Sequence, residues 1–65
     1  MLLGIVVDFD AERGLGCIDA DDGRSFPFHC TQIADGTRSI AVGAAVRFDV
    51  LAKLGRYEAT AISPR

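Results

Sequence analysis

The strongest constraint on the fold is an alternation of apolar and polar residues with a period of two along most of the chain. The clearest run sets apolar Val46, Phe48 and Val50 against charged Arg47 and Asp49. Because side chains of a β-strand point alternately to its two faces, this period predicts strands that bury one face. The pattern therefore favours an all-β domain.

Five segments are predicted as strands: residues 3–9, 15–20, 25–29, 45–52 and 57–62. The step Asp22–Gly23 predicts a hairpin between the second and third of them. The longest irregular segment, residues 30–44, contains a predicted helical turn over Thr31–Ala34 with Thr31 as its cap. Short strands and tight turns in a small chain predict a closed five-stranded barrel, since closure removes exposed strand edges. An SH3-like barrel fits the pattern nearly as well.

Glycine, proline and alanine positions add local expectations. Gly4 predicts a bulge or a close approach of two strands, and Gly14 a turn with positive φ. Pro27 cannot donate a hydrogen bond to a strand ladder, so it predicts an edge position or a break in the third strand. The spacing of Ala59 and Ala61 predicts that they share one face of the last strand.

Length and composition limit the domain organisation. The chain has 65 residues, 49% of them hydrophobic and 25% charged, which predicts one globular domain over residues 1–65 with a small core. No apolar run approaches the length of a membrane span, and residues 1–7 lack the basic start of a signal peptide. We therefore expect a cytoplasmic protein whose two cysteines, Cys17 and Cys30, are reduced.

Charge is distributed unevenly along the chain, which has a formal net charge of −2. Residues 1–22 contain six acids and one base, whereas residues 23–65 contain three acids and six bases. A general polyanion binder is disfavoured, because phosphate affinity comes mostly from Lys and Arg. Phosphate contacts are expected from the second part of the chain: Arg24, Arg38, Arg47, Lys53 and Arg56.

Two short motifs point to a family. Residues 13–18 read Arg-Gly-Leu-Gly-Cys-Ile, and residues 26–30 read Phe-Pro-Phe-His-Cys. Together they resemble the two nucleic-acid-binding motifs of bacterial cold-shock proteins, and the likeness extends from Gly4 to about Ile62. The resemblance implies an all-β, five-stranded antiparallel OB-fold barrel that binds single-stranded RNA or DNA.

In that family, outward aromatic residues and a histidine stack on successive bases. The corresponding positions here hold mostly other residues: Val7, Asp8, Leu15, Cys17, Pro27, Cys30 and, in the long loop, Thr37. Since each stacked base contributes about 1–3 kcal/mol, the resemblance implies weak or altered binding. The candidate nucleic-acid-binding residues are Phe9, Arg13, Leu15, Cys17, His29 and Arg56. Phe9 fits a core position as well as a ligand contact.

The sequence is also compatible with other classes of function. The apolar replacements on the outer face are also consistent with a protein partner or a homodimer. Asp8, Cys17, His29 and Cys30 form a less favoured ligand set for zinc, so we predict no metal and no cofactor. No catalytic constellation is recognisable, and the chain is not expected to be an enzyme.

By their parity, Ile18, Phe26, Phe28 and Phe48 are predicted to form the core.

Overall fold

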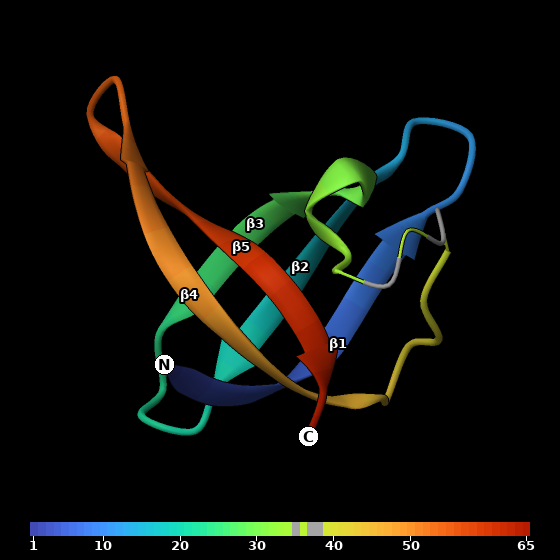
Figure 1. Ribbon diagram of the computed structural model, residues 1–65, viewed down its shortest axis with the longest axis horizontal. Coiled ribbons are helices and arrows are strands. Elements are labelled where there is room, and N and C mark those ends of the chain that lie inside the picture. The colour runs from blue at the N-terminus through green and yellow to red at the C-terminus, as the bar shows by residue number, and fades with distance from the viewer. Residues whose placement is uncertain (35, 37–38) are drawn as a thin grey trace.

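The computed structural model describes residues 1–34, 36 and 39–65 of the chain (Figure 1). Within this part the elements are β1 (Leu2–Asp10), β2 (Leu15–Ala20), β3 (Ser25–His29), the 3₁₀ helix η1 (Cys30–Gln32), β4 (Ala45–Lys53) and β5 (Arg56–Pro64). The strands form one antiparallel sheet in the order β3-β2-β1-β4-β5. The predicted five-stranded all-β fold is confirmed, and β2 and β3 have the predicted bounds. None of the described segments forms a helix long and apolar enough to cross a membrane.

One apolar core lies between the β1–β2–β3 part of the sheet and the β4–β5 hairpin, which curve across each other in Figure 1. The predicted core residues Ile18, Phe26, Phe28 and Phe48 are all buried. The rings of Phe26 and Phe48, from opposite parts of the sheet, meet edge to face at 5.6 Å. This geometry is favourable for aromatic pairs, so the contact ties the two parts together.

Two glycines behave as predicted. Gly4 pairs regularly with both neighbouring strands, and a Cβ at this position would lie 2.5 Å from the carbonyl oxygen of Asp19. Close packing, rather than a bulge, therefore explains Gly4. Gly14 has a φ of 66° in the β1–β2 turn, a conformation that favours glycine.

The strand register shifts in β1 and in β5, and the shift in β5 shows that one prediction is wrong. In β1 the register with β2 shifts between Val6 and Asp8. In β5 the register with β4 shifts around Ala61, whose φ is 52°. The expectation that Ala59 and Ala61 share a face is wrong, because the irregularity turns Ala61 outward and buries Ile62 in its place.

The helical turn begins one residue earlier than predicted. η1 starts at Cys30, and the residue at its N-cap is His29, which makes no side-chain capping bond. Thr31 is therefore not the cap. Its hydroxyl lies 3.3 Å from Nδ1 of His29 instead. The sequence also predicts a turn at Asp35-Gly36-Thr37, and Asp35 and Thr37 lie outside the described residues.

The prediction of a closed barrel is wrong, because the sheet keeps two edges in the described part of the chain. β3 and β5 are the two ends of the strand order and pack against each other, but no ladder joins them in the described part of the chain. Pro27 lies in the middle of β3 and is paired with Cys17 of β2 on the other side. Its missing N–H is thus at an edge, where it removes a donor that closure would need. β3 is continuous, which settles the two alternatives for Pro27 in favour of the edge position.

Candidate nucleic-acid interface

The outer face of β1–β2–β3 is built from three rows of residues that cross the strands. Antiparallel register sets these rows as Asp10–Leu15–His29, Asp8–Cys17–Pro27 and Ile5–Asp19–Ser25. We call these nine residues the outer face. Each row thus contains one aspartate, and apolar side chains occupy most of the remaining positions.

Beneath the first row, Phe9 is held by an aromatic contact. The rings of Phe9 and Phe28 stack at 6.0 Å with an interplanar angle of 7°. Gly16 is paired with both residues, and a Cβ there would collide with the Phe28 ring. Phe9 is consequently half-buried and packs against the core, so one face of its ring is already used.

A hollow at the β3–β5 edge brings together three of the predicted site residues. Leu15, His29 and Arg56 line this open space of about 300 Å³, together with Pro27 and Glu58. We call it the edge hollow. Leu15 and His29 are cross-strand partners, whereas Arg56 comes from the start of β5. The side chains of Leu15 and His29 are exposed, so an apolar group and an imidazole are available to a ligand.

The carboxylate of Glu58 already pairs with both cations near the edge hollow. Glu58 lies 3.7 Å from Nε of Arg56 and 3.6 Å from Nζ of Lys53. Because a single carboxylate is shared by two cations, this group retains positive charge. Sequence reasoning missed Glu58, although its i,i+2 spacing from Arg56 in a strand would have placed both on one face.

Arg13 lies away from the edge hollow, in the β1–β2 turn. Its Nε is 3.9 Å from Oδ2 of Asp10, and its side chain is largely exposed. The other oxygen of Asp10 accepts hydrogen bonds from the backbone N–H groups of Glu12 and Arg13. Asp10 therefore organises the turn and neutralises the nearby arginine.

Cys17 occupies the centre of the outer face. Partial burial raises the pKa of its thiol above the ordinary value, and the negative charges of Asp19 and Asp8 raise it further. Such a thiol stays protonated at neutral pH. The three aspartates of the outer face thus create a negative field that opposes both a thiolate and a phosphate.

The zinc alternative gains no support from the geometry. Cys30 is buried in the core, whereas Cys17 and Asp8 lie on the outer face. Across the described residues, no group of three His, Cys, Asp or Glu side chains could hold a metal ion.

Thr37, predicted to replace a loop aromatic, lies outside the described residues.

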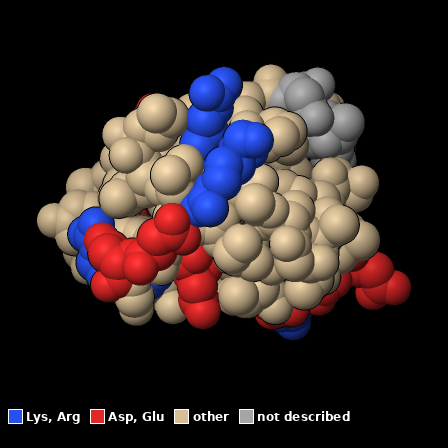
Figure 2. All heavy atoms as spheres, turned by 90° about the horizontal axis from the view of Figure 1, so that it is seen from below, with Lys and Arg blue, Asp and Glu red and all other residues tan. Residues whose placement is uncertain are grey.

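Charge on the surface is interspersed rather than gathered. Figure 2 views the molecule from below the orientation of Figure 1 and shows short basic patches, some beside acidic ones, within a largely uncharged surface. Several arginines lie close to aspartates, for example Arg24 with Asp22 at 2.7 Å and Arg65 with Asp21 at 2.9 Å. These exposed pairs add little stability, but they reduce the charge available to a phosphate backbone.

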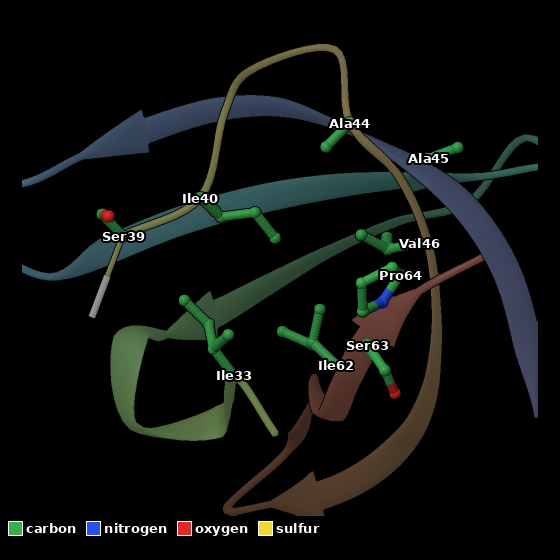
Figure 3. A pocket seen from close by; sticks show the side chains of 9 residues that line it. All are labelled: Ile33, Ser39, Ile40, Ala44, Ala45, Val46, Ile62, Ser63 and Pro64. Carbon is green, nitrogen blue, oxygen red and sulfur yellow. The ribbon is translucent and has the colours of Figure 1, made fainter. Parts of the chain in front are cut away.

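A second pocket lies apart from the outer face. It has a volume of about 100 Å³ and lies under the connection that leads into β4. Its side chains include Ile33, Ile40 and Ile62, which point toward one another in Figure 3. The lining is mostly apolar and continues the core, and none of the predicted site residues belongs to it.

Comparison with known protein families gives a match. The family model described as the 'Cold-shock' DNA-binding domain matches residues 2–65, essentially the whole chain. No curated protein matches the sequence.

Proposed function

The chain belongs to the cold-shock domain family, a family of nucleic-acid-binding domains, and we propose that it binds single-stranded RNA or DNA weakly, without enzymatic activity. The observation that carries this proposal is the edge hollow. It combines an exposed imidazole at His29, an apolar contact at Leu15 and a guanidinium at Arg56. An unstacked base can pack against the first two groups while its phosphate approaches the third.

The expected affinity follows from what these groups can supply. One stacked base contributes about 1–3 kcal/mol, and a single arginine–phosphate contact contributes a comparable amount at low salt. Taken at the middle of these ranges, their sum of about 4 kcal/mol corresponds to a Kd of roughly 10⁻³ M. The aspartates of the outer face prevent a longer strand from continuing across β2 and β1, which supports a short footprint.

A titration with matched charge variants tests this proposal. Wild type, Arg56→Gln and Arg47→Gln are titrated into a labelled oligothymidine of about seven bases, and fluorescence anisotropy is read over a series of salt concentrations. The two variants have the same net charge. Only Arg56 lines the edge hollow, whereas Arg47 is exposed on β4 opposite Leu3 and Ser63.

The proposal expects Arg56→Gln to weaken binding and to reduce the salt slope by about 0.7, the value for one phosphate contact to a single strand. Arg47→Gln should leave the slope unchanged. Equal loss in both variants would mean that only net charge matters. No binding by wild type at low salt and millimolar protein would contradict the proposed function.

A further inference from the structure

The tip of the β4–β5 hairpin contains a residue that its backbone does not favour. Leu54 and Gly55 form the turn, with φ values of 38° and 85°. Two-residue hairpin turns with positive φ at both positions prefer Asn-Gly or Asp-Gly, because a larger side chain is strained there. Leu54 is also fully exposed to solvent. An apolar side chain at this position lowers the stability of the isolated domain, and its presence there needs a structural explanation.

Two further apolar side chains are exposed in this hairpin. Leu51 is paired with Glu58 and Tyr57 with Ala52, so they lie on opposite faces of the hairpin, with exposed fractions of 44% and 61%. Lys53 and Arg56 flank the turn itself. The hairpin tip projects away from the rest of the sheet in Figure 1. Glu58 pairs with both cations, so the tip is an apolar protrusion that retains a net positive charge. Leu54 does not line the edge hollow.

The outer face has the complementary character. It exposes Leu15 and Ile5, and it holds Asp8, Asp10 and Asp19, one in each row. A face-to-face dimer would bring these aspartates against their own copies, which like-charge repulsion opposes. The basic tip of another copy brings opposite charge and an apolar side chain to the same surface.

We propose that two copies of this chain form a dimer in which the hairpin tip of each docks on the outer face of the other. The exchange is reciprocal, so it satisfies two-fold symmetry and closes without forming a filament. The accessible surface of one copy is 4146 Å², and a small interface of ~600 Å² per copy would use about a seventh of it. The dimer is thus weak and depends on concentration, and because it covers Leu15 it competes with nucleic acid.

The first test separates the role of Leu54 in contact from its role in the turn. Sedimentation velocity is measured from micromolar to millimolar concentration for wild type, Leu54→Asn and Val42→Asn. Asparagine suits the turn, so Leu54→Asn should unfold at higher urea than wild type and yet weaken the dimer about tenfold or more. Val42 is also exposed but lies outside the hairpin, and its variant should dimerise as wild type does. A monomeric wild type throughout this range would overturn the proposal.

The second test uses charge reversal. Lys53→Glu and Asp8→Lys should each weaken their own homodimer several-fold, with the loss greatest at low salt. In an equimolar mixture both contacts of the heterodimer regain opposite charges, so association should return to near the wild-type level. A mixture that associates no better than either variant alone would also overturn the proposal. Neither test involves nucleic acid, so its outcome is independent of the anisotropy titration.

Discussion

The two faces of β2 and β3 differ in what they retain from the family pattern. On the inner face, Ile18, Phe26 and Phe28 are buried and belong to the apolar core. On the outer face of the same strands, Leu15 and Pro27 are exposed at positions where the resemblance in the sequence implies stacking aromatics. Because alternate residues of a strand face opposite ways, each face can change without disturbing the other. The core and the proposed binding surface are therefore encoded by alternate residues of one short stretch.

The largest effect that this comparison predicts is on stability. Phe28→Ala removes a ring that is 2% exposed and should lower the free energy of unfolding by about 3–5 kcal/mol. In a domain this small, that loss leaves little folded protein at 25 °C. Leu15→Ala, on the opposite face of the neighbouring strand, should cost no more than about 1 kcal/mol. Urea denaturation followed by circular dichroism measures both, and equal losses would contradict the division between the faces.

The next largest effect is a gain of binding. Asp8→Trp combined with Leu15→Phe places two rings on the outer face and removes one carboxylate. At about 1–3 kcal/mol per stacked base, affinity for oligothymidine should rise at least about 30-fold. The control Asp8→Ala with Leu15→Ala removes the same charge without adding rings. If the control gained as much affinity as the aromatic variant, the missing rings would not be the cause of weak binding.

A smaller effect concerns the thiol at the centre of the outer face. Burial, Asp19 and Asp8 together raise the pKa of Cys17, so alkylation by iodoacetamide at pH 8 should be slower in the folded protein than in urea. Asp19→Asn should lower the pKa and speed the reaction by less than about tenfold. Mass spectrometry of the labelled peptides separates Cys17 from Cys30. An unchanged rate in Asp19→Asn would show that the aspartate field is screened by solvent.

The raised pKa of Cys17 also makes the stability of the folded protein depend on pH. The pKa of Cys17 is higher in the folded state than in the unfolded chain, so the folded protein holds the proton more tightly. This contribution is fully present below the unfolded thiol pKa and is lost as pH rises through the folded value. Stability should therefore fall slightly in mildly alkaline solution, and Cys17→Ser should reduce that slope in urea denaturation measured from pH 7 upward.

Sequence alone predicted the strands and the core, because these depend on side-chain parity, and at Gly4 it left a bulge and close packing as two alternatives that the structure decided. It failed at Ala61 and at Thr31, where an irregular register and the start of η1 depend on contacts between distant strands. The open β3–β5 edge also escaped prediction. Pro27 signalled an edge, yet parity cannot tell whether two edges meet through a ladder or through side chains.

The candidate site was predictable only in part, since its residues come from separate strands. Leu15 and His29 follow from the motifs, and the structure places Arg56 beside them across the edge hollow. The motifs also predicted Phe9 and Arg13, which do not line the edge hollow. The stacking of Phe9 on Phe28 and the ion pair of Arg13 with Asp10 are contacts that the motifs do not specify. The exposed tip at Leu54 required the backbone angles of the turn.

The central claim is that this domain keeps the cold-shock scaffold but binds single strands only at the edge hollow. Two-dimensional NMR of the ¹⁵N-labelled protein, titrated with oligothymidine at low salt, tests this most directly. The account predicts fast-exchange shifts at the backbone amides of Leu15, His29 and Arg56, with unsaturated binding at micromolar ligand. Tight binding in slow exchange, with shifts spread over Asp8, Cys17 and Asp19, would contradict it.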